Sequence, residues 1–358
     1  MKAIIRVTVL LIVTIILYLL LWPTGFQPAA WEPQADQGLT GDFAPNQILD
    51  KLALISVGSD HGPEDVDVDQ QGRLYFGTVE GRVLRCNADG SDIEVFAETG
   101  GRPLGLDFDT LGNLIVADAM KGLLRISPQG KMETLTTEHG GVPFKFTDDV
   151  EVGSDGKYYF SDASSKWDFH HFIHDLMEGV AYGRLLVYNP ATQQTDMLMD
   201  SLFFANGVAL NAAADFVLVN ETAQYRIRKY WLKGPKAGTH EVFAENLPGF
   251  PDGISRGSDG VFWVAFPTPR KADLDGMMSK PFLKKIIMRL PQSMHPAAER
   301  YGFAAGFDAE GSVVYNLQDP EGALSQITSV QERGNALYFG SLVEPAFGRL
   351  RLTDLPQR

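Results

Sequence analysis

The chain has 358 residues, and its 31 basic and 45 acidic side chains give a formal net charge of −14. This acidity argues against a nucleic-acid partner, because phosphate binding requires a basic face. A single cysteine, Cys86, excludes an intrachain disulfide. The 36 glycines and 20 prolines are spread along the chain, as is typical of a domain with many turns, and the length allows one large core.

The first 22 residues predict a membrane helix that acts as a signal anchor. Val7–Trp22 carries no charge, whereas Lys2 and Arg6 precede or open the stretch. Counted from Ile4, the segment is long enough to span a bilayer. The positive-inside rule then predicts a single-pass protein with a cytoplasmic N-terminus and the remaining chain on the periplasmic, extracytoplasmic or lumenal side. A cleaved signal peptide is the alternative, although its apolar core is normally shorter.

The remainder divides into a short tether and one domain. Residues 23–45 are rich in Pro, Gly, Gln and Ala, which predicts an irregular tether. Residues 46–358 then form a single domain. We expect Leu52–Val57 to supply a strand that pairs with the last repeat of this domain and closes it.

Six comparable units make up this domain. They start at Val66, Leu106, Val150, Val208, Ile254 and about Ile327. Most contain a turn between two apolar runs, such as Asp155-Gly156 in the third unit, which is typical of a hairpin. Repeats of roughly 40–50 residues with several strands each indicate a β-propeller. The sequence therefore predicts an all-β, six-bladed β-propeller preceded by one N-terminal transmembrane helix. A β-sandwich is the alternative, but two sheets do not account for six units.

Four of the units carry an oxygen ligand two residues before the strand begins. These ligands are Glu64, Asp148, Asn206 and Asp252. A side chain that recurs at one point of a repeated strand unit recurs at one point in space, so the four converge on the central axis. Three facing carboxylates repel one another unless a cation lies between them, and hard oxygen ligands suit Ca²⁺ better than zinc. We therefore predict a central metal site that binds one divalent cation, Ca²⁺.

Several motifs carry a family resemblance. GRPLGLDF, YFSDASS, GRLLVYNPATQQT, FFANGVAL and LPGFPDGIS resemble the strictosidine-synthase-like propellers, especially their membrane-anchored branch. The resemblance covers about residues 55–350 and extends more distantly to gluconolactonases and paraoxonases. It implies a six-bladed propeller with a divalent metal, usually calcium, in the central channel. The implied ligands are the four residues identified above.

Two departures from these families limit the chemistry. Strictosidine synthases use a glutamate in the loop entering the last blade, and Ser325 stands there in this chain. A hydroxyl without a neighbouring base cannot carry protons for an amine–aldehyde condensation, so we expect no alkaloid synthesis. Paraoxonases place a histidine in the loop entering the second blade, where this chain has Leu104. Their histidine mechanism is therefore not expected.

Metal-centred hydrolysis remains. A calcium ion open on one face would polarise an ester or lactone carbonyl. The resemblance to gluconolactonases makes Asp252 the candidate general base, and Asp149 is a second candidate. Arg102, at the mouth of the second blade, is predicted to orient a substrate carboxylate or carbonyl; a surface ion pair is the alternative.

Two insertions interrupt the repeats. Trp167–Gly179 in the third blade predicts a helical lid, with Trp167 and Phe172 among the residues that line an apolar entrance and bind substrate. Residues 267–290 in the fifth blade combine lysines with Met and Phe. This second insertion is open to three interpretations: a second lid, a contact with the membrane surface, or a solvated loop.

Two functional classes follow. The first is a calcium-dependent hydrolase of small-molecule esters or lactones, anchored on the outer face of the membrane. The second is a non-enzymatic propeller in which the metal is purely structural and the top face binds a ligand or a partner protein. The fold serves both purposes, so architecture alone does not choose between them.

Overall fold

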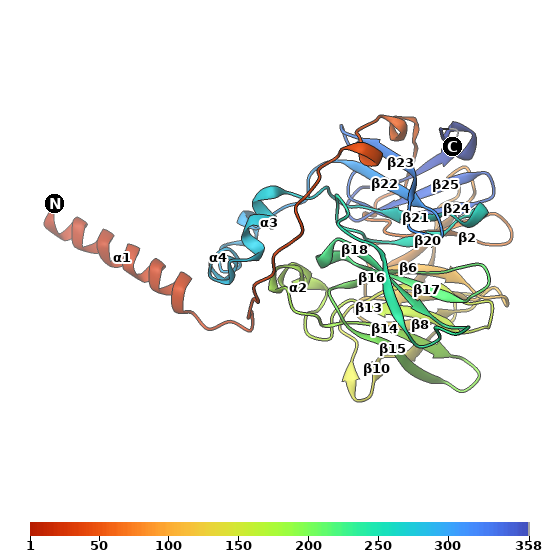
Figure 1. Ribbon diagram of the computed structural model, residues 1–358, viewed down its shortest axis with the longest axis horizontal. Helices are drawn as coiled ribbons and strands as arrows, with labels where there is room; N and C mark the ends of the chain where they lie inside the picture. The colour runs from red at the N-terminus through yellow and green to blue at the C-terminus, as the bar shows by residue number, and fades with distance from the viewer. Residues whose placement is uncertain (357–358) are drawn as a thin grey trace.

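The computed structural model describes residues 1–356. One long helix, α1 (Lys2–Leu21), precedes six four-stranded sheets that follow one another along the chain. In Figure 1, α1 projects away from the body that the sheets form. The prediction of an all-β, six-bladed propeller with one N-terminal apolar helix is confirmed, and the β-sandwich alternative is wrong.

Each blade is an antiparallel meander whose first strand lies innermost. Blade 1 comprises β2 (Val66–Val68), β3 (Leu74–Gly77), β4 (Arg82–Cys86) and β5 (Glu94–Glu98). Blade 2 comprises β6 (Pro103–Phe108), β7 (Leu114–Asp118), β8 (Gly122–Ile126) and β9 (Met132–Thr136). Blade 3 comprises β12 (Thr147–Val152), β13 (Tyr158–Asp162), β14 (Gly183–Asn189) and β15 (Gln194–Leu202). A small ribbon of β10 (Glu138–His139) and β11 (Val142–Pro143) precedes blade 3.

The second half repeats this plan. Blade 4 comprises β16 (Ala205–Leu210), β17 (Phe216–Glu221), β18 (Arg226–Trp231) and β19 (His240–Ala244). Blade 5 comprises β20 (Ile254–Arg256), β21 (Phe262–Ala265), β22 (Gly302–Phe307) and β23 (Val313–Asp319). Blade 6 comprises β24 (Ile327–Arg333), β25 (Ala336–Ser341), β26 (Ala346–Arg351) and β1 (Ala53–Ser56).

The last blade takes its outermost strand from the start of the domain. β1 pairs antiparallel with β26, with Ala53 opposite Arg349 and Ser56 opposite Ala346. The expectation that Leu52–Val57 closes the ring onto the last repeat is confirmed. Closure removes the free sheet edge that an open array of blades would leave.

In several blades, a side-chain oxygen at the first hairpin turn accepts hydrogen bonds from the backbone amides that follow it. In blade 1, Asp69 Oδ1 accepts the amides two and four residues later, both at 2.9 Å, and Gly72 takes a φ of +80°. The glycine-free turn of blade 4 keeps the same device. Asn211 Oδ1 accepts the amides four and five residues later, and Ala214 occupies the left-handed region at a φ of +49°. The fourth unit therefore keeps the turn although its sequence has lost the glycine.

The core lies between neighbouring blades. One apolar cluster joins Leu218 of blade 4 to Phe262 and Phe303 of blade 5. The next cluster joins Trp263 of blade 5 to Phe339 of blade 6. Full burial of such a side chain contributes roughly 1.5–3 kcal/mol. Because every blade is wedged between two others, the inner strands are held rigidly around the axis.

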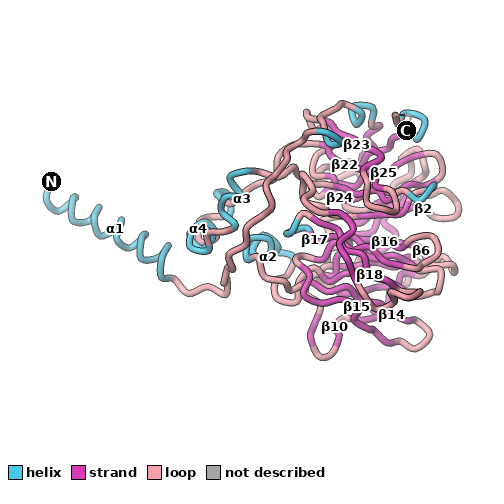
Figure 2. The backbone as a smooth tube through the Cα atoms, in the orientation of Figure 1, coloured by secondary structure: helices cyan, strands magenta, loops and turns pink. Residues whose placement is uncertain are grey.

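The short α-helices gather on the side of the propeller that faces α1 (Figures 1 and 2). The third-blade insertion contains α2 (Phe172–Glu178), and the fifth-blade insertion contains α3 (Ala272–Met278) and α4 (Pro281–Ile287). Short 3-10 helices occur at η1 (Gly41–Phe43), η2 (Ile48–Lys51), η3 (Phe169–His171), η4 (Thr222–Gln224), η5 (Ser258–Gly260), η6 (Gln292–Met294) and η7 (Leu352–Asp354). The helical content predicted for the third-blade insertion is confirmed.

The tether binds these insertions rather than hanging free. The amide of Ala29 donates to Glu178 O at 2.8 Å, and the amide of Trp31 donates to Met278 O at 3.1 Å. Lys284 Nζ, on α4, donates to Ala29 O at 2.7 Å. The segment after α1 therefore joins α2 to the α3–α4 pair and fixes both insertions over the propeller.

Candidate functional site

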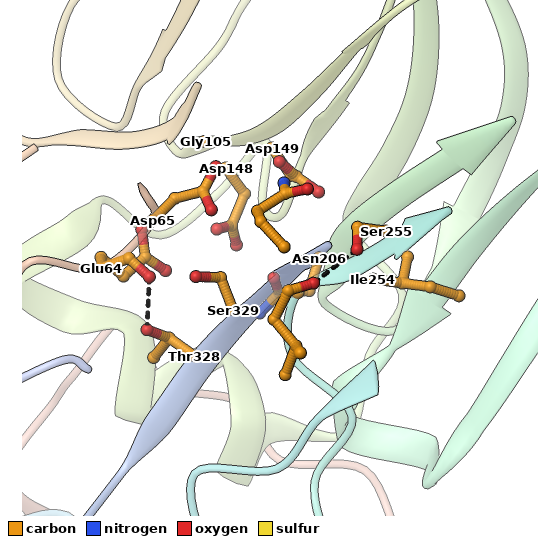
Figure 3. Close-up of a pocket in the computed structure, with 13 residues that line it drawn as sticks. Glu64, Asp65, Gly105, Asp148, Asp149, Asn206, Ile254, Ser255, Thr328 and Ser329 are labelled. Carbon is orange, nitrogen blue, oxygen red and sulfur yellow. Dashed lines mark hydrogen bonds between the residues drawn. The ribbon is translucent and has the colours of Figure 1, made fainter. Parts of the chain in front are cut away.

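The repeated ligand position brings four oxygen-bearing side chains together. Glu64, Asp148, Asn206 and Asp252 each stand at or just before an innermost strand, and all four line one cavity. Figure 3 shows the first three around a common space near the propeller axis. Glu64, Asp148 and Asn206 are buried, whereas Asp252 is half-buried. Their shared place follows directly from their shared position in the repeat.

Burial and mutual repulsion raise the proton affinity of these carboxylates. Burial, followed by repulsion from Asp252, raises the pKa of Glu64 well above its usual range. Burial, with Glu64 and Asp252 adding to it, does the same to the pKa of Asp148. Burial raises the pKa of Asp252 to about 8, although a hydrogen bond with Asn206 opposes the change. The cluster therefore favours added positive charge, whether as protons or as a cation.

Unsatisfied polar atoms mark the same place. Glu64 Oε2 and Asp148 Oδ2 are buried without a hydrogen-bond partner, a situation that is rare for buried polar groups. Among residues 1–356, no three Asp, Glu, His or Cys side chains are close enough to hold a metal ion by themselves. The fourth predicted ligand, Asn206, is an amide. The four side chains offer oxygen donors of the type that a hard divalent cation such as Ca²⁺ prefers, but the three carboxylates among them are not spaced as a preformed ligand group.

A second layer of residues, one position further along each strand, ties the blades together. Asp149 Oδ1 accepts the amide of Val150 at 2.8 Å, and its Oδ2 accepts the amide of Val208 in the next blade at 2.7 Å. Asp65 does the same between blades 1 and 2. Both oxygens of Asp149 are thus engaged with backbone, and this side chain does not line the large cavity. The structure separates it from Asp252, the other candidate base.

Glycine replaces aspartate in this second layer of blades 4 and 5 for a steric reason. A Cβ on Gly207 would collide with the backbone around Asp252 and Ile254, and one on Gly253 would collide with Thr328 O. Glycine at position 253 therefore follows from the close approach of the adjacent blade.

Asn220 is a site residue that the sequence did not reveal. It is fully buried at the end of β17, and its side-chain amide donates to the backbone carbonyl of Asp252. Thr222 Oγ1 donates to Pro251 O at 2.7 Å. Together they fix the loop that carries Asp252. The only signal in the sequence was a run of polar residues at the end of a predicted strand. The loop that Asn220 contacts belongs to the next blade.

Above the acidic cluster lies a cavity of about 440 Å³ with a predominantly apolar wall. This volume is within the range of small-molecule sites. Its apolar lining includes Leu104, Phe146, Phe169, Phe172, Ile173, Leu176, Phe204 and Phe250. The helical insertion α2 forms part of this wall and leaves the cavity open to the carboxylates.

The two aromatic residues predicted to bind substrate have different places. Phe172 lines the cavity. Trp167 does not: its indole Nε1 donates to Glu178 Oε2 at 2.7 Å, and its ring packs against His174 with centroids 4.9 Å apart. Trp167 belongs to an apolar cluster with Phe26 of the tether and Met278 of α3. It supports the insertion from behind, whereas Phe172 faces the cavity.

Arg102 differs from both interpretations of the sequence. It is only 1% exposed, so it forms no surface ion pair and does not stand at the mouth. Its Nη1 donates to Gly62 O at 2.9 Å, whereas Nε and Nη2 have no partner. Burial lowers the pKa of Arg102, and Glu64 is the largest opposing influence. Its place is that of a buried countercharge to Glu64, and it is not among the residues lining the cavity.

Two family profiles and full-length relatives match the chain. The strictosidine synthase profile matches residues 148–235, and the profile of the strictosidine synthase-like N-terminal region matches residues 41–86. Protein strictosidine synthase-like 4 of Arabidopsis thaliana is 37% identical over 344 residues, which are 93% of this chain and 91% of the relative. The chain belongs to the strictosidine synthase-like family. Adipocyte plasma membrane-associated protein of Bos taurus is 36% identical, with 87% of this chain and 81% of the relative covered.

Solved structures show the same propeller at low sequence identity. A gluconolactonase from Xanthomonas campestris matches with a TM-score of 0.61 and 17% identity, covering 94% of this chain and 99% of the other. A calcium-binding protein, regucalcin, from Agrobacterium tumefaciens matches with a TM-score of 0.60 and 12% identity, covering 84% and 93%. At these identities the likeness shows the shared fold alone.

Within this strictosidine synthase-like chain, Ser325 has a neighbour that the sequence did not predict. Its hydroxyl donates to Glu344 Oε1 at 2.6 Å, and Arg300 pairs with the same carboxylate at 2.8 Å. The expectation that Ser325 lacks a neighbouring base is wrong, because the loop after β25 brings Glu344 beside it. Neither Ser325 nor Glu344 lines the large cavity.

Proposed function

We propose that this protein is a calcium-dependent hydrolase of esters or lactones, anchored on the outer face of a membrane by α1. The observation that supports the proposal best is the cavity itself. A cavity of about 440 Å³ with apolar walls leads to three carboxylates and an amide. Two of the carboxylate oxygens are buried without hydrogen-bond partners. Apolar pockets with a few convergent polar groups are the usual form of small-molecule sites.

The wall selects the substrate. Aromatic side chains from α2 and from loops between strands, including Phe146, Phe172 and Phe250, surround the space. Such a surface binds aryl groups and acyl chains by burying their apolar area, whereas free sugars would lose hydrogen bonds to water without replacement. Aryl esters, acyl esters and apolar lactones are therefore the expected substrates.

The metal ligands would be Glu64, Asp148, Asn206 and Asp252. Calcium, when bound, supplies Lewis acidity for a carbonyl oxygen and neutralises the negative charge that develops there. Without a cation, the buried carboxylates face one another at a cost that their raised pKa values express. The unpartnered guanidinium nitrogens of Arg102 supply part of the compensating charge beside Glu64.

Asp252 is the general base in this proposal. Its carboxyl group lines the cavity and is half-buried, so water and substrate reach it. Its loop is fixed through Asn220 and Thr222. A carboxylate held in this way takes a proton from an attacking water at the carbonyl carbon. Asp149 is the weaker candidate, because both of its oxygens accept backbone amides.

The position of Ser325 outside the cavity lining favours hydrolysis over condensation. Ser325 and Glu344 hydrogen bond to each other outside the cavity lining, and Arg300 pairs with the carboxylate. A carboxylate engaged by both partners is a poor acid–base group for a substrate bound against the aromatic wall. The Ser325–Glu344 pair therefore acts as a structural link between loops of blade 6.

The test is an assay of purified full-length protein with a panel of aryl esters, acyl esters and lactones, with and without a calcium chelator. We expect turnover that disappears on chelation and returns with added calcium. Asp252→Asn should abolish turnover, and Ser325→Ala should serve as the matched control that retains it. Calcium-dependent stabilisation without turnover of any substrate would instead support the non-enzymatic, ligand-binding alternative.

A further inference from the structure

The C-terminal end of α1 is clamped to the fifth-blade insertion. Arg289, just after α4, donates from Nη1 to Leu19 O and from Nη2 to Trp22 O, both at 2.7 Å. In return, Tyr18 Oη donates to Arg289 O at 3.2 Å. The guanidinium thus satisfies carbonyl groups that a helix leaves open at its C-terminus. Arg289 therefore holds α4 beside the last turn of α1, so the two lie at the same position along the axis of α1.

The length of α1 sets the depth of this position in a bilayer. Twenty residues rise about 30 Å, which equals the thickness of a bilayer's hydrocarbon core. A helix of this length has no turn to spare, so its last turn lies at the membrane interface when it spans. Tyr18 and Trp22 suit this depth, since aromatic side chains with a polar end concentrate there. Arg289 then holds α4 at the interface as well.

α4 exposes apolar side chains and buries a charged one. Phe282 is 60% exposed, Leu283 is 39% exposed, and Met294 of the following segment is 60% exposed. Lys284, between them, is buried and bonded to the tether. This distribution is the reverse of what water favours for a surface helix. We refer to Phe282, Leu283 and Met294 as the α4 patch.

We infer that the α4 patch is a second membrane contact, which inserts into the interface of the bilayer that α1 spans. The partner is a lipid surface because the patch is continuous with the interfacial end of α1. Lys280, the N-cap residue of α4, and Lys285 on α4 flank Phe282 and Leu283, as in helices that lie in a membrane interface.

The contact brings the cavity to the bilayer. Gln292, Ser293, Ala297 and Ala298 are exposed and also line the cavity, so the segment after α4 forms part of its rim. Leu274 and Met278 of α3 line the same cavity. The mouth therefore opens beside the membrane surface. Under the proposed function, on which this consequence rests, the substrate is an amphiphile that partitions into the bilayer and enters from it.

Depth-dependent fluorescence quenching tests the contact without any measure of hydrolysis. Full-length protein is reconstituted in phosphatidylcholine vesicles that contain a lipid with a nitroxide on its upper acyl chain. A polarity-sensitive fluorophore is attached to a single cysteine introduced as Phe282→Cys or Leu283→Cys. The native Cys86 does not interfere, because it is buried and burial raises the pKa of its thiol to about 11.

Leu111→Cys provides the matched control. Leu111 is 79% exposed in the β6–β7 turn, at the end of its blade opposite to the insertions. We expect severalfold stronger quenching at positions 282 and 283 than at 111, with unchanged melting temperatures. Quenching no stronger than at position 111 would overturn the inference. Labels that move to an apolar environment without being quenched by the lipid would also overturn it, because the patch would then bind protein.

Discussion

Asp175 supplies a sharp prediction, because it is a buried carboxyl group without a partner. It lies on α2, is fully enclosed, and neither oxygen has a hydrogen-bond partner. Burial raises the pKa of Asp175 from 3.8 to about 8, and repulsion from Glu178 and Asp162 adds to the shift. Replacement by asparagine keeps the shape and removes the proton equilibrium.

The magnitude follows from the difference between the two pKa values. The folded carboxyl holds its proton when the unfolded one has lost it, so its contribution to stability is complete below about pH 4. That contribution is lost progressively as the pH rises to about 8. Each pKa unit corresponds to about 1.4 kcal/mol, so the total loss approaches 6 kcal/mol as an upper bound. Because α2 is a short insertion, local opening is expected before the propeller unfolds.

Hydrogen exchange of the α2 amides measures this opening. After correction for the intrinsic exchange rate, protection of α2 (Phe172–Glu178) should fall about tenfold per pH unit between pH 5 and 8, as expected for one proton. Asp175→Asn should flatten the dependence, and the buried strand β7 (Leu114–Asp118) should show none in either protein. A wild-type α2 whose corrected protection ignores pH, or a variant that keeps the slope, would refute the reasoning.

Four further predictions concern the site and the anchor. Asp252→Ala should remove most of the calcium-dependent rise in melting temperature; wild-type protein purified without chelators that contains no calcium and shows no such rise would contradict the metal site. Phe172→Ala should lower kcat/KM for long acyl and aryl esters by roughly tenfold or more and hardly affect short acyl esters, because only large substrate groups contact the Phe172 ring and lose that contact in the variant. Ser325→Ala should cost about 1 kcal/mol of stability through the lost bond to Glu344 and leave hydrolysis nearly unchanged; condensation of tryptamine with an aldehyde, lost in this variant, would argue against hydrolysis. The mature protein should retain residues 1–22, resist carbonate extraction and expose the propeller outside; an N-terminus near Trp31 would show a cleaved signal peptide instead.

The repeated part of the molecule was the part that the sequence could predict. A hairpin unit has one place for each side chain, so Glu64, Asp148, Asn206 and Asp252 could be put on one axis from their positions alone. Ring closure through β1 followed from a strand-like run left over before the first unit. Each of these inferences uses local periodicity, which the chain carries within a few residues.

The parts that failed depend on contacts made by loops and insertions, which lie outside the repeated strands. Nothing near Ser325 in sequence indicates Glu344, because the loop after β25 brings the two together. The burial of Arg102 depends on Gly62 of blade 1, and the orientation of Trp167 on Glu178 across the insertion. Such pairings are set by tertiary packing, for which a single sequence holds no periodic signal.

The pairing of β1 with β26 also orders the events of synthesis. Ala53 leaves the ribosome early, yet its partner Arg349 follows only about 300 residues later. The nascent chain must therefore keep β1 unpaired until blade 6 is complete. Blades 1 to 5 can form in sequence as they emerge, whereas the ring can lock only at the end of translation. Truncation of even the final strand would leave β1 without a partner and the edge of β25 open, exposed to chaperones and proteases.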